Sequence, residues 1–364
     1  MKRATRAAPG KGNDMTRVGI IGCGYISRLH YEGYERAGAK IVHVCDIRKE
    51  AAEAVGSRYS ARVSTDYRAV IEDRDVDLVS VCTIASTHKE ICLAALACGK
   101  GVVCEKTLTD NAADSAELVL ASRRTKAFLS VAYMKNYFPA VVQAKQMLAE
   151  MGDVTSIYVR TWHFHPQLWQ SPAPEDVLQH PSRIVRNYGG GMLVCGGSHV
   201  LNLLCGFAGR PTKVIGAMQS RPGMDFDIQT NAMLWLPAGG VAHFEAFWHP
   251  FAAIGYERNG WDERIEINTA KGRLELYTVL WNGSENHGAL LVHTDADTGR
   301  VTEYRFPAVN VFDLEMAGMI EAFETGGLAT PSAADGYVVD ELIEQITSSH
   351  RQGGKGLPVT YRVQ

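Results

Sequence analysis

The chain has 364 residues, of which 46% are hydrophobic and 21% are charged, so it is long enough to form two domains with separate cores. A formal net charge of -3 offers no basic surface to nucleic acid or to an anionic membrane, and no apolar run is long enough for a membrane-spanning helix. We therefore expect a small-molecule partner, no nucleic acid and no membrane.

The leader from Met1 to Asp14 is rich in Lys, Arg, Ala and Gly and lacks the apolar core of a secretion signal. We expect residues 1–14 to be disordered. The eight cysteines are scattered singly, without a Cys-x-x-Cys pair, which is typical of reduced thiols in a reducing compartment. These features predict a cytoplasmic protein.

The N-terminal part alternates short β-rich runs with helical patterns, which predicts parallel strands joined by crossover helices. The predicted strands are Arg17 to Ile21, Ile41 to Cys45, Asp77 to Cys82, Gly101 to Glu105 and Phe128 to Ala132. Between them, apolar residues recur at the three- and four-residue spacing of helices. These helices are Ile26 to Ala37, Arg48 to Tyr59, His88 to Cys98 and Ala112 to Arg124. Residues 15–137 are therefore predicted to form a Rossmann-type domain with a doubly wound parallel sheet.

After a predicted helix from Pro139 to Glu150, the chain changes to long β-rich runs. They are Val154 to His165, Lys213 to Arg221, Ala232 to His249, Ile265 to Tyr277 and Ala289 to Phe306. Turn signals interrupt these runs in the manner of antiparallel hairpins. The turns lie at Ala238-Gly239-Gly240, Lys271-Gly272 and Asp297-Thr298-Gly299.

Two predicted helices close the chain, one from Phe312 to Thr325 and one after Ser332. Ser332 and Asp335 have the spacing of a capping box, in which each residue bonds the other's backbone amide. We interpret residues 138–364 as a second, α+β domain around a large, mainly antiparallel sheet.

A glycine turn, Gly22 to Ser27, directly follows the first predicted strand. Gly22 permits a tight turn, and Gly24 lets the backbone approach a pyrophosphate. The pyrophosphate would be held by the first amides of the next helix, at Tyr25 and Ile26. A tight turn without a ligand is the alternative.

Asp46 follows the second predicted strand, where a carboxylate can accept hydrogen bonds from both hydroxyls of an adenosine ribose. Its charge would repel a 2′-phosphate, which favours NAD over NADP, although Arg48 keeps NADP open. Asp46 can instead cap the following helix. Because strand, glycine turn, helix, second strand and acid occur in register, we predict that this domain binds a dinucleotide, NAD.

The strand ending at Glu105 continues into Lys106 and Thr107, at the sheet edge where ligands of such folds bind. In a hydride-transfer enzyme, a lysine at this edge can exchange a proton with the substrate hydroxyl. A solvated lysine at a strand end is the alternative.

A further glycine-rich segment, Gly189 to Asn202, reads GGGMLVCGGSHVLN. Together with the glycine turn and Glu105-Lys106, it resembles the Gfo/Idh/MocA family of sugar and polyol oxidoreductases, over essentially the whole chain after Met15. The resemblance implies NAD(P)-dependent hydride transfer to or from a secondary alcohol or ketone of a sugar, inositol or related polyol. It also implies that Lys106 is the catalytic proton shuttle and that His199 assists in the same pocket.

Cys195, His199 and Asn202 recur at helical spacing and so share one helix face, where they are predicted to face the substrate. The alternative for His199 is a buried core histidine. Cys195 and Asn202 stand where the family has two Asp residues, and a Cys-x-x-x-His pair alone does not make a zinc site, so we expect no metal. Thr107 replaces a family Pro, and because a cis bond before a non-proline residue costs about 3 kcal/mol, we expect a trans bond after Lys106.

Four more residues are predicted to contact ligands. Thr83 and His88 fit the family's loop beside the nicotinamide, where we expect backbone contacts. Lys135 resembles a residue of the interdomain segment and can reach a substrate hydroxyl, unless it is a solvated linker lysine. His163, within the run Trp162 to His165, can line a sugar pocket with Trp169 by hydrogen bonding and stacking, or it can belong to an ordinary strand with alternating burial.

The broad sheet of the second domain offers a face for subunit packing, so we expect a homodimer or homotetramer. Two alternative functions stay open. The altered Asp positions are compatible with an NAD-binding sugar sensor that has lost turnover. Bound NAD can also support redox-neutral chemistry, such as epimerisation or glycosidic cleavage.

Overall fold

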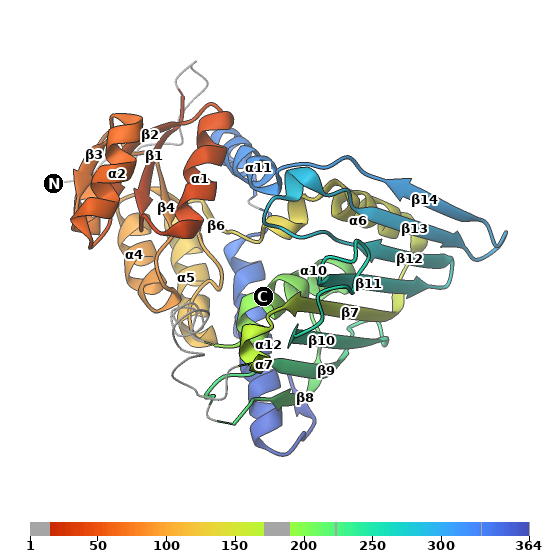
Figure 1. Cartoon of the computed structure of the whole chain (residues 1–364). Coiled ribbons are helices and arrows are strands. Elements are labelled where there is room, and N and C mark those ends of the chain that lie inside the picture. Colours follow the sequence, from red (N-terminus) through yellow and green to blue (C-terminus); the bar gives the residue numbers. More distant parts are fainter. Residues whose placement is uncertain (1–14, 171–189, 223, 329, 364) are drawn as a thin grey trace. The chain divides into compact units, whose positions relative to one another are not determined.

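The computed structural model describes residues 15–170, 190–222, 224–328 and 330–363; the predicted leader and Gly189 lie outside the described residues. The chain forms two compact units (Figure 1). The N-terminal unit contains the chain as far as Met134, Phe312–Tyr337 and Val363. The C-terminal unit contains Lys135–Val311 and Val338–Arg362.

The described residues of the N-terminal unit contain a six-stranded sheet with the order β3-β2-β1-β4-β5-β6, in which all pairs are parallel. Its strands are β1 (Arg17–Ile21), β2 (Lys40–Cys45), β3 (Arg62–Ser64), β4 (Leu78–Val81), β5 (Gly101–Cys104) and β6 (Leu129–Val131). The doubly wound parallel sheet is confirmed. Strand β3 was not predicted, because a three-residue edge strand is too short to show a periodic pattern.

Helices follow the strands of this sheet as predicted, within a few residues at each end. They are α1 (Tyr25–Arg36), α2 (Lys49–Tyr59), α3 (Tyr67–Glu72), α4 (Ala85–Ala97) and α5 (Ala112–Thr125); the short α3 was not predicted. Val79, Val102 and Val103 on the central strands are completely buried. Burial on both faces is the pattern of a parallel sheet that helices cover from both sides.

The chain returns to the N-terminal unit near its end. Helix α11 (Val311–Thr325) packs on α1 where Gly33 has no side chain, since a Cβ there would lie 2.7 Å from Met316 Cγ. Arg36 of α1 also pairs with Asp313, at 2.5 Å. The structure thus groups Phe312–Tyr337 with the N-terminal unit, whereas the sequence divided the chain only once. A helical pattern shows which face of a helix is apolar but not which core receives it.

The described residues of the C-terminal unit contain a nine-stranded sheet with the order β14-β13-β12-β11-β7-β10-β9-β8-β15. Its strands are β7 (Val154–Phe164), β8 (Lys213–Gln219), β9 (Gln229–Trp235), β10 (Val241–His249), β11 (Trp261–Thr269), β12 (Gly272–Tyr277), β13 (Leu290–Asp295), β14 (Val301–Arg305) and β15 (Leu357–Pro358). The pair of β7 and β10 is parallel, and the other pairs are antiparallel. The large, mainly antiparallel sheet is confirmed.

The predicted turns join neighbouring strands of this sheet. Gly239 links β9 to β10 with φ +93°, and Gly299 links β13 to β14 with φ +68°. Glycine adopts this left-handed region without the steric cost that a Cβ brings, which explains why both hairpins were visible in the sequence.

Helices cover one face of the C-terminal sheet (Figure 1). The helical segments of this unit are η1 (Met134–Tyr137), α6 (Pro139–Met151), α7 (Gln167–Gln170), the π-helix η2 (Leu193–Gly197), α10 (Ser198–Ala208), η3 (Ser284–Asn286) and most of α12 (Ala333–Arg351). Ile157 and Val159 of β7 are buried on the helix side, while Tyr158 and Arg160 on the other side are half-buried. No helix in the described ranges is long and apolar enough to cross a membrane.

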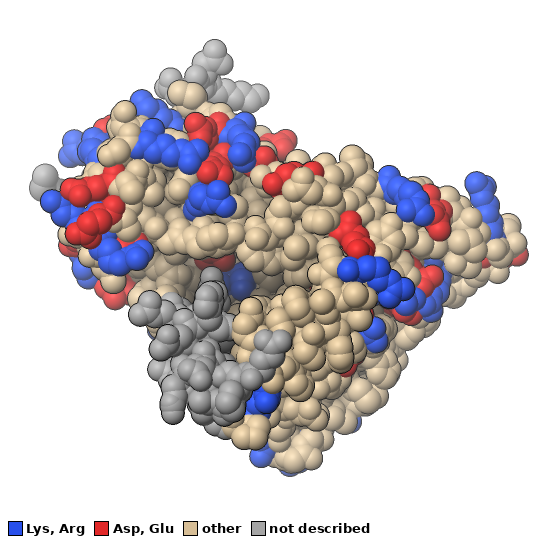
Figure 2. Space-filling model, viewed as in Figure 1, with Lys and Arg blue, Asp and Glu red and all other residues tan. Residues whose placement is uncertain are grey.

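Charged side chains of both signs are intermixed on the surface of α1 and α2, as Figure 2 shows. Arg58, for example, pairs with Glu32 at 3.0 Å and with Glu35 at 3.5 Å. Such exposed pairs contribute little to stability. Neither sign of charge dominates this part of the surface, as the formal net charge of -3 indicates for the chain.

Candidate functional site

The predicted glycine turn has the geometry of a phosphate-binding loop. Gly22 has φ +92°, and a Cβ there would lie 2.6 Å from the backbone oxygen of Cys82. At Gly24, by contrast, a Cβ would meet nothing within 4 Å among the described residues. Gly24 caps α1 without a side-chain hydrogen bond, and the first turn of α1 contains no acidic residue. The first amides of α1, at Tyr25 and Ile26, are therefore suited to hold a pyrophosphate.

Asp46 lies beside this turn, directly after β2. One carboxylate oxygen accepts a hydrogen bond from the Cys23 amide at 2.8 Å, and the other accepts one from the Arg48 amide at 2.8 Å. These bonds fix the carboxylate, while each oxygen keeps capacity for a further donor such as a ribose hydroxyl. The Arg48 side chain is 66% exposed, with its Nε 3.4 Å from Asp46. Arg48 occupies the N-cap position of α2 without a side-chain capping bond, and Asp46 lies two residues before it.

The loops after β4 and β5 are joined by His88. Its Nδ1 lies 3.0 Å from the oxygen of Thr107 and its Nε2 lies 3.1 Å from the oxygen of Thr83. Burial lowers the pKa of His88, although these carbonyl oxygens oppose the shift. The His88 side chain is thus occupied inside the protein, and the expected backbone contacts of Thr83 and His88 with a ligand stay a prediction.

Glu105 follows β5 and is buried in a polar cluster that the sequence did not reveal. His30 of α1 places Nε2 2.9 Å from Glu105 Oε1 and Nδ1 2.9 Å from Ser80 Oγ. The second oxygen of Glu105 accepts a hydrogen bond from the Lys106 amide at 2.9 Å. The cluster thus connects the core of the sheet to the backbone of the predicted catalytic lysine.

The charges in this cluster support one another. Burial alone would lower the pKa of His30, but Cys82 and Glu105 raise it well above its usual value. Burial alone would raise the pKa of Glu105, but the hydrogen bond and charge of His30, with the charge of Lys106, lower it. Glu105 is therefore an ionised side chain held in the interior by a protonated histidine.

The peptide bond between Lys106 and Thr107 is cis, so the expected trans bond is wrong. The expectation applied the cost of a cis bond in an isolated peptide. In the structure, Thr107 is buried and its oxygen bonds to His88, while the Lys106 amide bonds to Glu105. The surrounding contacts, not the residue type alone, determine the backbone here.

In the C-terminal unit, the glycine-rich segment packs against Asp227 at Gly191. A Cβ at Gly191 would lie 2.0 Å from the Asp227 backbone oxygen, so only glycine fits there. The Asp227 carboxylate accepts hydrogen bonds from the Leu193 amide and the Thr230 hydroxyl, each at 2.9 Å. Burial raises the pKa of Asp227, and these hydrogen bonds oppose the shift. Asp227 thereby holds the first turn of the helix that carries Cys195.

Cys195, His199 and Asn202 lie on two helical segments rather than on one regular helix. Cys195 is in η2, whose π-helical turn is wider than an α-helical one, and His199 and Asn202 are in α10. His199 and Asn202 are buried. Asn202 Oδ1 accepts a hydrogen bond from Asn136 Nδ2 at 2.7 Å. Within the described ranges, no group of three or more His, Cys, Asp or Glu side chains is arranged to hold a metal ion.

Lys135 is completely buried and forms an ion pair with Glu263 of β11. The structure therefore does not place this lysine in a solvated linker, and its amino group is occupied by a carboxylate. Glu263 also accepts hydrogen bonds from the Thr161 hydroxyl at 2.7 Å and from the Thr278 hydroxyl. A direct contact between Lys135 and a substrate stays a prediction that this arrangement does not favour.

His163 lies near the end of β7 and lines a cavity of about 280 Å³. Its ring stacks on Trp261 with centroids 3.9 Å apart, and its Nε2 is 2.9 Å from Thr161 Oγ1. His165, Trp281 and Asn282 line the same cavity. Trp169, which was expected beside His163, is not among the residues that line this cavity and donates a hydrogen bond to the Trp248 backbone oxygen at 2.9 Å. The cavity therefore combines aromatic faces with polar groups, as a sugar-binding site requires.

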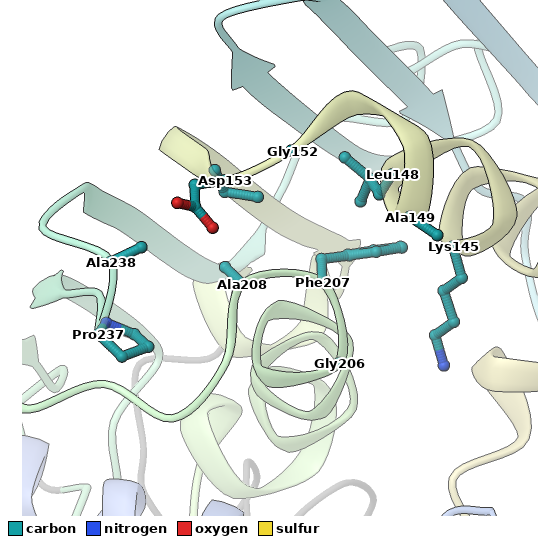
Figure 3. A pocket seen from close by; sticks show the side chains of 11 residues that line it. Lys145, Leu148, Ala149, Gly152, Asp153, Gly206, Phe207, Ala208, Pro237 and Ala238 are labelled. Atoms are coloured by element: carbon teal, nitrogen blue, oxygen red, sulfur yellow. The ribbon is translucent and has the colours of Figure 1, made fainter.

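A second cavity of the C-terminal unit, of about 400 Å³, contains none of the predicted residues. It lies at the ends of α6 and α10 and at the β9–β10 turn. Figure 3 shows the Lys145 amino group and the Asp153 carboxylate on opposite sides of this hollow. It adjoins Val154, the first residue of β7, whereas His163 lies at the other end of that strand. We therefore do not assign the larger cavity to the candidate site.

Sequence reasoning missed four polar residues: His30, Thr161, Asp227 and Glu263. Two of them carried a signal. Thr161 and Glu263 have the inward phase of β7 and β11, which they share with Val159 and Ile265. A polar or charged residue at an inward strand position indicates a buried polar network. Asp227 precedes β9 in a loop and carried no such signal.

Comparison with known proteins places both units in one family. The family model described as "Oxidoreductase family, NAD-binding Rossmann fold" matches residues 16–133. A second model, described as "GFO/IDH/MocA C-terminal domain", matches residues 141–275.

Two relatives and one solved structure are distant in sequence but match 90% or more of this chain. Inositol 2-dehydrogenase of Paracoccus denitrificans is 26% identical over 94% of this chain and 96% of its own length. Inositol 2-dehydrogenase 3 of Saccharopolyspora erythraea is 27% identical over 90% of each chain. Among solved structures, levoglucosan dehydrogenase in complex with NADH and levoglucosan has the same fold, with a TM-score of 0.80, 20% identity and coverage of 95% of this chain and 100% of that one. The chain belongs to the GFO/IDH/MocA family of oxidoreductases, and its N-terminal unit is the family's NAD-binding Rossmann domain.

Proposed function

We propose that this protein is an NAD-dependent dehydrogenase or reductase that acts on a secondary alcohol or ketone of a sugar, inositol or related polyol. The observation that supports it most is the open first turn of α1, with Gly24 and the fixed carboxylate of Asp46 beside it. The inositol and levoglucosan dehydrogenases among its relatives support the substrate class.

The arrangement around Asp46 supports NAD rather than NADP. A 2′-phosphate would bring two negative charges close to a carboxylate that the Cys23 and Arg48 amides hold in place. Arg48 is 66% exposed, and its Nε already pairs with Asp46 at 3.4 Å, so it offers weak compensation. We expect NAD to bind more tightly than NADP.

In the proposed reaction, Lys106 accepts the proton of the reacting hydroxyl and returns it when a ketone is reduced. The bound nicotinamide supplies the hydride chemistry. Glu105 positions the lysine backbone through the bond to its amide and is itself held by His30. His199 assists the proton transfer, and Cys195, Asn202 and His163 are proposed to contact the substrate.

The test is a panel of inositols, aldoses, anhydrosugars and keto-sugars, followed by the change in nicotinamide absorbance. Lys106→Ala is expected to lower kcat/KM on any active compound by about 10²- to 10⁴-fold, while NAD affinity measured by calorimetry stays within a few fold. The exposed Lys49 provides the control variant Lys49→Ala, which should keep full activity. Full activity of Lys106→Ala would refute the role of Lys106.

We also propose that the protein is cytoplasmic and assembles as a homodimer or homotetramer. A reducing compartment is supported by free thiols at Cys23, Cys45, Cys82, Cys92, Cys98 and Cys104.

The assembly is supported by the sheet face opposite the helices, which exposes 39% of Phe164 and 38% of Met233; such apolar groups suit subunit contact. Light scattering on the eluting protein tests the assembly, and a monomer at micromolar concentration would contradict it.

A further inference from the structure

We propose that Lys145 is a positioning residue that acts through Asn136 to fix the side-chain amide of Asn202. The amide of Asn202 then presents its NH2 group, and not its oxygen, to an oxygen of the bound sugar or polyol. This inference rests on the proposed function, because it specifies what Asn202 offers to that ligand. The three residues belong to the C-terminal unit.

Lys145 forms the outer end of this chain. It lies on α6, borders the 400 Å³ cavity and is half-buried, as Figure 3 shows. Its side chain passes beside α10 at Gly206, where a Cβ would lie 3.4 Å from Lys145 Cε and 3.5 Å from Nζ. A side chain larger than a methyl group at this position would meet the lysine. The glycine therefore leaves room for the amino group of Lys145 to reach Asn136.

The first hydrogen bond determines the orientation of Asn136. Lys145 Nζ donates to Asn136 Oδ1 at 2.7 Å. Because an ammonium group has three N–H donors and no acceptor, only the oxygen of the Asn136 amide can face it. The nitrogen and oxygen of an amide are assigned from their partners, and Asn136 is buried. A reversed amide would bring its NH2 group against the ammonium without an acceptor, which is costly in the interior.

The second hydrogen bond transmits this orientation to Asn202. With its oxygen toward Lys145, Asn136 points Nδ2 at Asn202 and donates to Asn202 Oδ1 at 2.7 Å. Turning the Asn202 amide over would place two NH2 groups against each other and leave both without an acceptor. Lys145 therefore determines which end of the Asn202 amide faces away from Asn136.

That end is Nδ2, which carries two N–H donors. Asn202 is buried, and among the described residues no protein group accepts a hydrogen bond from its Nδ2. A buried donor without an acceptor costs free energy. Asn202 lies three residues after His199 on α10, so the two side chains are neighbours on one helix face. A ligand oxygen held beside His199 supplies the acceptor that the protein does not.

The orientation of Asn202 has a consequence for specificity. The NH2 group only donates, so it binds any ligand oxygen that accepts, whether a hydroxyl, an ether or a keto oxygen. A carboxylate, which the family motif has at this position, can only accept and needs a hydroxyl donor. At this point of the ring, the chain therefore requires an acceptor and does not require a proton on the ligand.

The first experiment measures the orientation of Asn202 in the full chain without a ligand. Nitrogen-15 NMR of asparagine-labelled protein follows the exchange of the Asn202 NH2 hydrogens with water, with the signals identified by their loss in Asn202→Ser. These hydrogens should exchange rapidly, because no protein acceptor holds them. In Asn136→Asp they should exchange at least about tenfold more slowly, because the new carboxylate takes the Lys145 bond and draws the NH2 group of Asn202 inward. Slow exchange in the unmodified protein, or equal exchange in Asn136→Asp, would overturn the inference.

The second experiment measures recognition by calorimetry with NAD present, using myo-inositol, levoglucosan and their monodeoxy and monodeoxyfluoro derivatives. Fluorine accepts a hydrogen bond weakly and does not donate one. In the unmodified protein, removing one hydroxyl should weaken binding about five- to tenfold, and fluorine at the same position should recover part of the loss. In Asn136→Asp the oxygen of Asn202 faces outward, so the fluoro derivative should bind no better than the deoxy one. A merely structural role of Asn136 would weaken all derivatives alike.

The third experiment tests Lys145 itself. Lys145→Met keeps the length of the side chain but removes its donors, so it should raise KM for the ring about fivefold, with a smaller change in kcat and unchanged NAD affinity. Lys145→Arg keeps N–H donors and should recover most of the loss. Gln146→Met, at the next and exposed position of α6, is the matched control and should leave KM unchanged. An unchanged KM in Lys145→Met would contradict the role of Lys145.

The outcomes separate this inference from the proposed function. If rings bind and turn over but their derivatives rank alike in the unmodified protein and in Asn136→Asp, the inference is wrong and the proposed function stands. If no ring binds the unmodified protein at millimolar concentration, the proposed substrate class fails, and the ligand contact of Asn202 fails with it. NAD affinity, measured separately, shows whether the cofactor assignment survives either result.

Discussion

At the scale of single residues, the two glycines of the nucleotide turn have different reasons to be glycine. The fold requires glycine at position 22, because the φ of Gly22 is +92° and a Cβ there would lie 2.6 Å from the Cys82 backbone oxygen. Gly24 has ordinary φ, and the described residues leave the space around it empty. We infer that a ligand at this turn is the reason for the missing side chain at Gly24.

We therefore expect Gly24→Ala and Gly22→Ala to separate binding from folding. Gly24→Ala should leave the melting temperature within about 2 °C, yet weaken NAD at least tenfold, because its methyl group enters the space of the pyrophosphate. Gly22→Ala should lower the melting temperature markedly, since both strain and a backbone clash oppose it. Calorimetric titration and thermal unfolding measure the two effects. Equal NAD affinity in Gly24→Ala would show that the cofactor does not approach this turn.

Glu315 of α11 presents a second residue-scale feature, because it is fully buried and neither carboxyl oxygen has a partner among the described residues. Burial, reinforced by the charge of Glu105 and opposed by that of His30, raises the pKa of Glu315 from 4.5 to about 8. The folded protein thus keeps the Glu315 proton where the unfolded chain loses it. Stability from this group is complete below pH 4.5 and falls by about 1.4 kcal/mol per pH unit up to about pH 8.

Glu315→Gln should remove that slope, because an amide does not ionise. Relative to the unmodified protein, the variant should gain a few kcal/mol of stability between about pH 5 and about pH 8, as measured by urea unfolding at a series of pH values. Glu321→Gln on the exposed side of the same helix is the control and should run parallel to the unmodified protein. Parallel profiles for Glu315→Gln would mean that Glu315 is ionised in the fold.

At the scale of elements, long periodic segments were predictable and short or irregular ones were not. The capping box is confirmed, since Asp335 accepts from the Ser332 amide at 2.7 Å and Ser332 Oγ accepts from the Asp335 amide at 3.4 Å. In contrast, the π-helical turn at Leu193–Gly197 has no periodic signature of its own. Tertiary contacts surround this turn: Asp227 accepts a hydrogen bond from the Leu193 amide, and His163 packs against Gly196.

Asp227 should be needed for that turn. In Asp227→Ala, the Leu193 amide and the Thr230 hydroxyl lose their buried acceptor, which costs about 1 to 3 kcal/mol. We expect a lower melting temperature together with weaker binding of substrate and little change in NAD affinity. Asp225→Ala, two residues earlier and exposed, should behave like the unmodified protein. If both variants behave alike, the carboxylate does not support the helix that carries Cys195 and His199.

The candidate site was predictable to the extent that its residues follow strand ends or a family motif. Gly22, Asp46 and Lys106 all follow parallel strands, and such positions can be read from strand prediction alone. The buried partners that orient them could not be found in this way. His30 meets Glu105 across 75 positions of the chain, and only the folded sheet brings the two together.

At the scale of the whole molecule, the N-terminal unit is discontinuous in sequence. Besides Gly33 and Met316, it is closed by Phe323, whose ring lies 2.5 Å from the position of a Cβ at Gly101, and by the 2.5 Å hydrogen bond from Thr16 to Glu324. The sequence pattern predicted these helices correctly but could not assign them to a core. The composition of their apolar faces is compatible with either unit. Gly33 of α1 and Gly101 of β5 leave the space into which Met316 and Phe323 pack, and this packing assigns the helix to the N-terminal unit.

This discontinuity predicts that the Rossmann unit cannot be isolated by cutting the chain after its last strand. A fragment of residues 15–134 would expose the surfaces of α1 and β5 that Met316 and Phe323 cover. Loss of a fully buried side chain such as Met316 alone costs about 2 to 5 kcal/mol. The fragment should therefore lack a cooperative thermal transition and bind NAD at least a hundredfold more weakly than the full chain. Joining residues 312–337 to it through a flexible linker should restore both properties. Full NAD affinity of the fragment alone would show that the returning helices are not part of the nucleotide-binding core.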